Sequence, residues 1–171
     1  MFYPPHASKM RITNHQFRKL TVNPAWITEV SPSGLRCLAH RINNRIDLWA
    51  DGKTRIMAPY AELKRQIKDM IPNQTVIDGV LFGEDKARDH YFVFDIPQFK
   101  GSSAGALFTR HALLRSLYRN QPLIKISKQS DNAYCQIQKS VNSIYMKCLD
   151  STYLLDYKRP KINPHWIKII L

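Results

Sequence analysis

The sequence predicts one α+β domain in which a few helices pack on antiparallel sheets. Short runs that alternate apolar and polar residues follow one another along the chain, and this pattern is typical of half-buried strands. Two other segments repeat apolar residues at helical spacing. A length of 171 residues with 44% hydrophobic and 11% aromatic residues suits one folded domain with its own core.

The first residues differ from the rest of the chain. Residues 1–22 lack a regular pattern, so we expect a basic N-terminal arm ahead of a domain at 23–171. The arm has no acidic residue and no apolar secretory core, which leaves organellar targeting open. Three scattered cysteines fit neither a disulfide framework nor a zinc site, and they indicate an intracellular, reducing compartment. No apolar run approaches the roughly 18 residues of a membrane span.

The first strands of the domain are predicted to include a hairpin. Residues 26–30 predict a strand, and Ser-Pro-Ser-Gly at 31–34 predicts a turn. The alternating runs 35–42 and 45–49 are separated by two asparagines only. Because asparagine tolerates the positive φ of a tight turn, these runs predict a β-hairpin.

A helix is expected at residues 60–70, where Leu63, Ile67 and Met70 share one face and Pro72 follows. The near-continuous apolar runs at 75–83 and 90–96 predict central strands that are covered on both faces. The remaining expected elements are a helix at 109–119 with Thr109 as its N-cap, a strand at 123–127, a third helix from Asp131, and strands at 143–149 and 165–171.

Charge is the strongest compositional feature. Lys and Arg number 26 against 13 Asp and Glu, a formal net charge of +13. Such an excess favours a polyanionic partner, because neutralising phosphates releases condensed counterions. We therefore predict that the protein binds nucleic acid, DNA or RNA, alone or within a larger nucleoprotein complex, and that it has no membrane partner. The alternative is a basic protein without a specific partner. The candidate nucleic-acid-binding residues are Arg41, Arg45, Lys53, Arg55, Lys158, Arg159 and Lys161.

We expect few acidic partners among these basic residues, because few acidic residues are interleaved with them in the sequence. Arg110, Arg115 and Arg119 are expected on an exposed face of the second helix. Trp49, Tyr153 and Tyr157 lie near basic loops and are compatible with stacking on unpaired bases, although the pattern is not specific.

The order of these elements and several of their motifs resemble the nucleotidyltransferase (adenylation) domain of ATP-dependent DNA ligases. The family's first motif, E-x-K-x-D-G-x-R, corresponds here to EVSPSGLR at 29–36, and its L-D-G-E-L strand corresponds to IDGVL at 77–81. The strand YFVFDI at 91–96 and the stretch KCLDSTY at 147–153 follow in the family's order. The resemblance runs from about residue 26 to 170 and implies a ligase-type nucleotidyltransferase fold. RNA ligases and capping enzymes share this fold, but the K-x-x-D-S-x-Y stretch favours the DNA-ligase branch.

The resemblance also identifies what is missing. The family's lysine attacks the α-phosphate of ATP, and Ser31 stands in its place without a base at useful spacing. Val80 and Asn142 replace two metal-binding glutamates, and Mg²⁺ needs oxygen ligands that valine lacks. Ile170 replaces a phosphate-contacting lysine, and the sequence ends before an OB-fold domain. We therefore expect a catalytically inactive pseudoenzyme with no catalytic residue, metal site or cofactor.

Five residues match nucleotide-binding positions of the family and leave residual ATP binding open. The resemblance places Glu29 near the adenine, Arg36 at the ribose and Phe94 on the base, with Lys147 and Lys168 facing phosphate. The residues alone leave other roles open: Glu29 and Arg36 could pair with one another, and Phe94 could be core. One alternative function is an active ligase or nucleotidyltransferase that uses ATP and Mg²⁺ with an unorthodox nucleophile or a partner chain. A protein-interaction module with a filled cleft is another.

Overall fold

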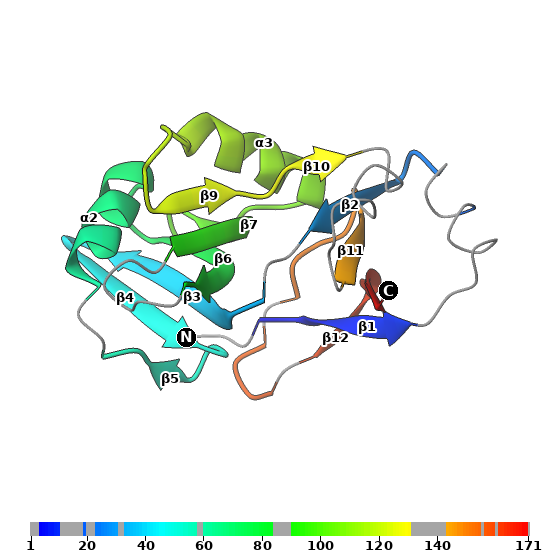
Figure 1. The fold of residues 1–171 in the computed structure, drawn as a ribbon, viewed down its shortest axis with the longest axis horizontal. Helices are drawn as coiled ribbons and strands as arrows, with labels where there is room; N and C mark the ends of the chain where they lie inside the picture. Colours follow the sequence, from blue (N-terminus) through cyan, green and yellow to red (C-terminus); the bar gives the residue numbers. More distant parts are fainter. Residues whose placement is uncertain are drawn as a thin grey trace.

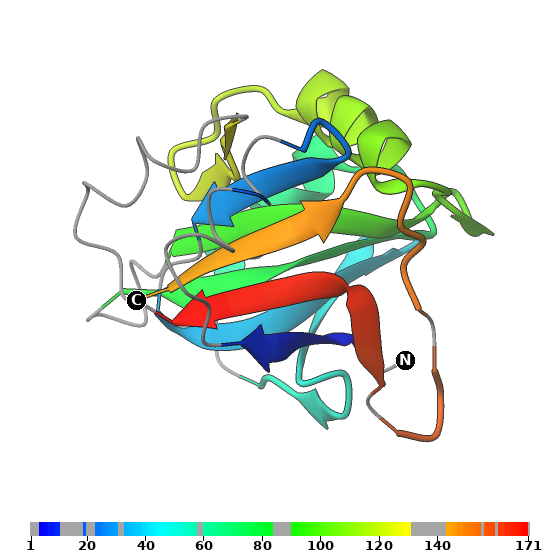
Figure 2. The same ribbon diagram turned by 90° about the vertical axis from the view of Figure 1, so that its right-hand side faces the viewer.

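The chain forms two β-sheets that face each other, with helices on the outer side of the larger sheet (Figures 1 and 2). The architecture is that of a computed structural model. It confirms the predicted α+β class and its mainly antiparallel sheets. The described residues are 4–10, 19, 23–30, 33–57, 60–83, 90–130, 143–154, 156–159 and 161–170.

The larger sheet has the strand order β5-β4-β3-β6-β7-β8, and β9 pairs with β7 in parallel. β6 lies between β3 and β7 and is buried along nearly its whole length, as its apolar sequence predicts. Asn43 adopts a φ of 52° in the turn between β3 and β4, which confirms the hairpin. The strands are β3 (Leu35–Ile42), β4 (Arg45–Ala50), β5 (Thr54–Arg55), β6 (Thr75–Phe82), β7 (His90–Phe99), β8 (Ser102–Ser103) and β9 (Ile124–Ile126).

The smaller sheet has the order β1-β12-β11-β2-β10. Part of the expected arm differs from the prediction, because residues 6–10 form an edge strand that pairs in parallel with β12. The last strand also begins earlier than predicted, at Ile162, and pairs on both sides. The strands are β1 (His6–Met10), β2 (Trp26–Val30), β10 (Gln129–Ser130), β11 (Ser143–Cys148) and β12 (Ile162–Ile170).

Helix α2 (Ala61–Met70) buries the predicted apolar face against the larger sheet. The Arg41 guanidinium donates to the carbonyl oxygens of Lys68 and Ile71 at the end of this helix, so Arg41 serves as a C-terminal cap. No helix of the described ranges is long and apolar enough to span a bilayer.

Helix α3 (Leu107–Leu117) begins two residues before the predicted start, so the assignment of Thr109 as N-cap is wrong. Ala106 takes the N-cap position, and the buried Leu107 and the hydrogen bond from the Phe108 amide to the Leu149 carbonyl fix the first turn. The third helix expected from Asp131 lies outside the described residues.

Among the described residues, apolar clusters lie on both faces of the larger sheet. The main cluster lies between this sheet and helices α2 and α3, and it includes Ile67, Ile77 and Leu114. A smaller part lies between the two sheets, where Leu38 and Val76 meet Tyr153 and Trp166. The space between the sheets is therefore filled at one end by apolar packing, and the candidate site lies beside that packing.

Candidate functional site

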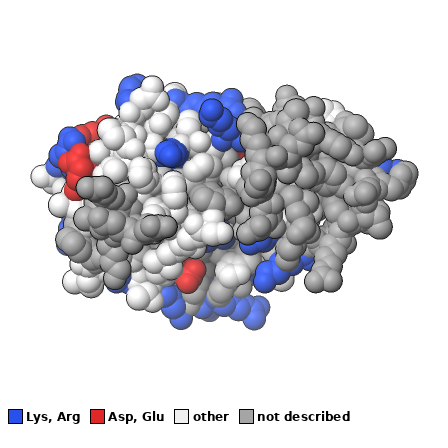
Figure 3. Space-filling view, viewed as in Figure 1, with Lys and Arg blue, Asp and Glu red and all other residues white. Residues whose placement is uncertain are grey.

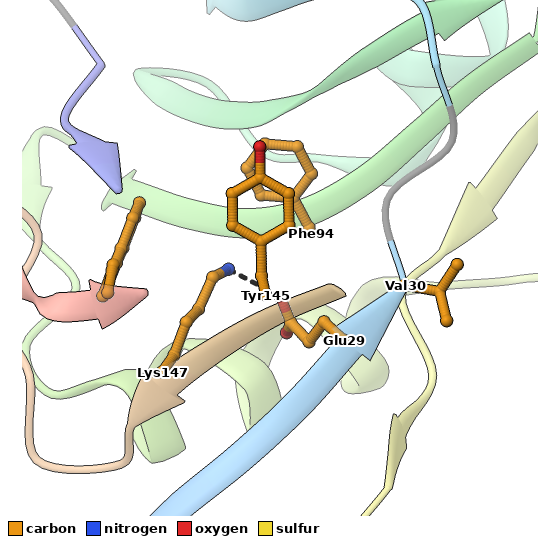
Figure 4. A pocket seen from close by; sticks show the side chains of 6 residues that line it. Glu29, Val30, Phe94, Tyr145 and Lys147 are labelled. Carbon is orange, nitrogen blue, oxygen red and sulfur yellow. Dashed lines mark ion pairs between the residues drawn. The ribbon is translucent and has the colours of Figure 1, made fainter. Parts of the chain in front are cut away.

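A small cleft lies between the two sheets (Figure 4). Its lining residues are Glu29 and Val30 of β2, Phe94 of β7, Tyr145 and Lys147 of β11, and Trp166 of β12. The volume that the centre of a water molecule can reach is about 10 Å³. This is roughly the volume that one water needs.

Strand register explains why these side chains meet. Tyr145 pairs with Glu29, and Lys147 pairs with Trp166, so all four side chains project from the same face of the smaller sheet. On the opposite wall, the register of β6 and β7 shifts by one residue, and Phe94 has no direct partner on β6. Such a β-bulge re-aims a side chain, here into the cleft.

Glu29 is buried and lies next to two basic groups. One carboxylate oxygen lies 2.6 Å from Lys147 Nζ, and the other lies 3.1 Å from His111 Nε2 of α3. Glu29 Oε1, His111 Nε2 and Lys147 Nζ nevertheless make no hydrogen bond of good geometry among the described residues. Burial lowers the pKa of His111 although Glu29 acts in the opposite direction, so the imidazole is neutral at pH 7.

Lys147 and Phe94 form the centre of the cleft. The Lys147 ammonium lies 4.8 Å from the centre of the Phe94 ring and 4.7 Å from that of Trp166, which are cation–π distances. The Arg36 guanidinium carbon lies 5.4 Å from the same Phe94 ring. Phe94 is therefore half-buried between cations of the chain itself, and Lys147 contacts Glu29 and two rings.

Arg36 pairs with Asp78, not with Glu29. Its Nη2 and Nε donate to the Asp78 carboxylate at 2.6 and 3.2 Å, and its Nη1 donates to the Pro5 carbonyl at 2.8 Å. The Tyr153 hydroxyl donates to the same carboxylate at 2.6 Å. Burial lowers the pKa of Arg36, but the Asp78 charge, the hydrogen bond to Asp78 and the nearby Tyr153 and Tyr145 together outweigh it, so the pKa is raised.

Arg110 is buried, which corrects its predicted place on an exposed helix face. It donates to both Asp95 carboxylate oxygens, at 2.6 and 3.1 Å, and to the carbonyl oxygens of Gly105 and Ser151 at 2.6 and 2.9 Å. Burial would raise the pKa of Asp95, but the charges of Arg110 and Lys147 lower it. The side chain therefore ties α3 to β7 and to the loop after β11.

The positions of the missing catalytic groups are only partly described. Ser31 and Asn142 lie outside the described residues. Val80 is buried and packs against Gly34, where a Cβ would overlap both the Val80 side chain and the Leu81 carbonyl. The glycine lets the turn between β2 and β3 approach β6, and the Val80 side chain has no metal-ligating atom. Lys168 is half-buried, with its Nζ 5.5 Å from the centre of the Tyr145 ring.

The expectation of few acidic partners is wrong for several basic candidates. Asp47 is buried and binds Arg45 Nη2 at 3.0 Å and Arg55 Nη2 at 2.6 Å. Lys161 pairs with Asp156 at 2.9 Å. Sequence spacing hides these pairs, because Asp47 meets Arg55 only through the pairing of β4 with β5. Lys53, Lys158 and Arg159 also have exposed side chains.

Several residues of the site carried no signal in the sequence. His111 is a single histidine on a helix, and Asp78 reads as part of a weak Asp-Gly pattern. The alternation of Tyr145 with Lys147 is the one clue that both face the same side. Within the described part of the chain, no group of three or more His, Cys, Asp or Glu side chains is placed to hold a metal ion.

Solved structures identify the fold. The ligase domain of M. tuberculosis LigD superposes with a TM-score of 0.74 at 17% identity, over 97% of this chain and 58% of the other. The ATP-dependent DNA ligase of bacteriophage T7, in complex with ATP, gives 0.54 at 13% identity, over 98% and 68%. The chain has the nucleotidyltransferase fold of ATP-dependent DNA ligases. This confirms the fold that the motifs predicted.

This ligase-type fold is shared at low sequence identity. A Lig E DNA ligase, studied for DNA binding with a minimal scaffold, gives a TM-score of 0.62 at 12% identity, over 97% of this chain and 69% of the other. The chain spans about three fifths of the mycobacterial chains that it matches, 58% and 60%. Neither models of protein families nor characterised protein sequences match the sequence.

Proposed function

We propose that this chain is a catalytically inactive ligase-type domain that binds nucleic acid through a basic surface, as a scaffold or subunit of a nucleoprotein assembly. The observation that carries the proposal is the state of the cleft. Lys147, which the resemblance assigns to phosphate, is instead buried between Glu29 and two aromatic rings. Only about 10 Å³ is open to a water centre beside it.

The residues around the cleft support loss of catalysis. Ser31 offers no amine for a phosphoramidate, and Val80 offers no oxygen to Mg²⁺. Arg36, assigned to the ribose, already donates to Asp78 and to the Pro5 carbonyl. A nucleotide would therefore have to displace internal partners of both Lys147 and Arg36 before any chemistry could begin.

The charge of the surface supports a nucleic-acid partner. In the view of Figure 3, Lys and Arg atoms gather along the upper edge, over α3 and β9, and along the lower edge near β5, whereas Asp and Glu atoms occupy few places. The Lig E relatives of the fold bind DNA with a minimal scaffold. We define the upper basic edge by four exposed residues of α3, of β9 and of the segments that follow them: Arg115, Arg119, Lys125 and Lys128.

Binding across a salt series tests the nucleic-acid part of the proposal. Affinity for a labelled oligonucleotide should fall linearly on a log–log plot as salt rises, because each neutralised phosphate releases counterions. The charge-removing variants Lys158→Ala and Arg159→Ala should each reduce this slope. No binding at low salt, or an affinity that is independent of salt, would contradict the proposal.

An active nucleotidyltransferase with an unorthodox nucleophile or a partner chain remains the second candidate. Incubation with labelled ATP or GTP and Mg²⁺ or Mn²⁺ separates the two. We expect no covalent nucleotide on the protein. A covalent adduct that is lost in the Ser31→Ala or Lys53→Ala variant would overturn the pseudoenzyme assignment and establish the enzyme.

A further inference from the structure

A strip of half-buried aromatic side chains lies on the larger sheet, next to the cleft but outside its lining. Phe82 of β6 pairs with His90 of β7, and Phe92 of β7 pairs with Lys125 of β9. Directly paired residues on neighbouring strands project to the same face, and so do residues two apart along a strand. These four side chains, the aromatic strip, therefore share one face of the sheet, and Phe94 continues it into the cleft.

The rings of the aromatic strip contact one another and a lysine through their faces. The rings of Phe82 and His90 are stacked, with centroids 5.4 Å apart and an interplanar angle of 29°. Lys125 Nζ lies 5.8 Å from the centre of the Phe82 ring, and the lysine itself is exposed. Phe82, His90 and Phe92 are each half-buried, so their rings are partly accessible to a ligand.

These side chains lie on the opposite face of the sheet from the main core. Their neighbours along β7, Tyr91 and Val93, point to the other face and are completely buried in the main core. Phe82 and Phe92 belong to neither apolar cluster of the described residues. The strip is thus a partly exposed aromatic surface on a strand pair whose opposite face already supplies the core.

The chemistry of the strip selects its partner. Ring faces bind flat aromatic groups, and the exposed Lys125 beside them can bind an anion. Unpaired nucleobases joined by phosphates combine both features, whereas a duplex hides the faces of its bases. The net charge of +13 and the exposed Lys125 and Lys128 on and just after β9 favour such a polyanion over an apolar protein surface.

We propose that the aromatic strip binds single-stranded nucleic acid. Unpaired bases stack on Phe82, His90 and Phe92, and Lys125 contacts a backbone phosphate while Lys128 extends the path of the strand. This inference rests on the proposed nucleic-acid binding and names its ligand: a single strand, recognised by stacking without base-specific hydrogen bonds.

Titration of the full chain with a fluorescent single-stranded oligonucleotide, and with the same strand in a duplex, tests the proposal. Phe82→Leu and Phe92→Leu should each weaken single-strand binding at least about fivefold, because each variant removes the stacking of a base on one aromatic side chain. Both substitutions keep an apolar side chain, and duplex binding should change little. Thermal unfolding checks that each variant remains folded.

The chain offers a matched control outside the strip. Lys100 Nζ lies 5.4 Å from the centre of the half-buried Phe99 ring, a pair that resembles Lys125 over Phe82. Lys100→Ala and Lys125→Ala remove the same charge, so both lower non-specific affinity equally. Only Lys125→Ala should lower the preference for the single strand.

A photocrosslinking experiment on the unmodified protein does not depend on the folding of any variant. An oligonucleotide containing 4-thiouridine should crosslink to peptides that contain Phe82, His90 or Phe92. Two outcomes would overturn the proposed role of the strip while leaving nucleic-acid binding intact. One is crosslinking confined to other peptides. The other is an equal loss of single-strand preference in Lys100→Ala and Lys125→Ala, together with unchanged binding by the leucine variants. Absence of any binding at low salt would instead overturn the proposed function itself.

Discussion

Two buried ion pairs lie close together in this domain, and they differ in how completely they are satisfied. Arg110 makes four hydrogen bonds, two to Asp95 and two to backbone carbonyls. Lys147 lies 2.6 Å from Glu29, yet its ammonium makes no hydrogen bond of good geometry among the described residues. The first pair joins a helix to a strand and a loop, whereas the second lines the cleft.

The difference indicates what each pair is for. A buried charge is retained at low cost only when its hydrogen bonds are complete, and the Arg110 pair meets that condition. The Glu29–Lys147 pair satisfies the charges but not the hydrogen bonds, and the resemblance assigns both of its residues to nucleotide binding. We interpret the first as a structural tie and the second as an internal substitute for a ligand.

Arg110→Met should give the largest loss of stability. The variant leaves Asp95 buried without its cation, and breaking a buried pair in this way typically costs about 3–5 kcal/mol of unfolding free energy. Urea denaturation measures the change. Arg65→Met removes a cation from an exposed pair with Glu62 and Asp69 and serves as the control, with a much smaller effect. Equal losses of unfolding free energy in the two variants would show that Arg110 does not hold α3 to β7.

Lys147→Met should cost less, about 1–3 kcal/mol, because it removes the ion pair with Glu29 but no hydrogen bond of good geometry among the described residues. The methionine keeps an unbranched side chain against Phe94 and Trp166. Adding Glu29→Gln removes the carboxylate left without its cation, so the double variant should be more stable than Lys147→Met alone. If the second substitution lowers stability further, the contributions of Glu29 and Lys147 to stability are not coupled, although the two side chains are in contact.

These two pairs also show what the sequence could and could not predict. The strands, the Asn43 hairpin and the order of the motifs follow from local pattern, and the ligase-type fold followed from that order. The partner of Lys147 could not be predicted, because Glu29 lies more than a hundred residues away and meets it only through the pairing of β2 with β11. Arg110 shows the same limit: its helical position indicates surface, and only the tertiary position of Asp95 makes it core.

Stability should fall as pH is lowered from 7 to 5, and His111 should account for part of the fall. Burial lowers the pKa of His111 in the folded state from its ordinary value of 6.5, so the unfolded chain binds the proton first. Below pH 6.5 this contributes at most about 1.4 kcal/mol per pH unit until the folded state also protonates.

His111→Gln should flatten the pH dependence of the unfolding free energy, measured by urea denaturation at several pH values. His40 is half-buried, and burial lowers its pKa as well. The variant His40→Gln therefore measures how much His40 contributes to the pH dependence of the unfolding free energy. An unchanged slope in His111→Gln would mean that the imidazole beside Glu29 does not resist protonation.

Added ATP with Mg²⁺ should have the smallest effect of all, namely no stabilisation. A ligand at a hundred times its Kd stabilises a folded protein by about 2.7 kcal/mol, which raises the Tm of a domain of this size by roughly 5–10 °C. A measurement of Tm therefore detects even modest binding. Because Lys147 and Arg36 already have internal partners and the cleft admits about one water, millimolar ATP should leave the Tm unchanged. A clear rise in Tm that Phe94→Leu abolishes would mean that the cleft opens and that the Glu29–Lys147 pair is a gate and not a substitute for the ligand.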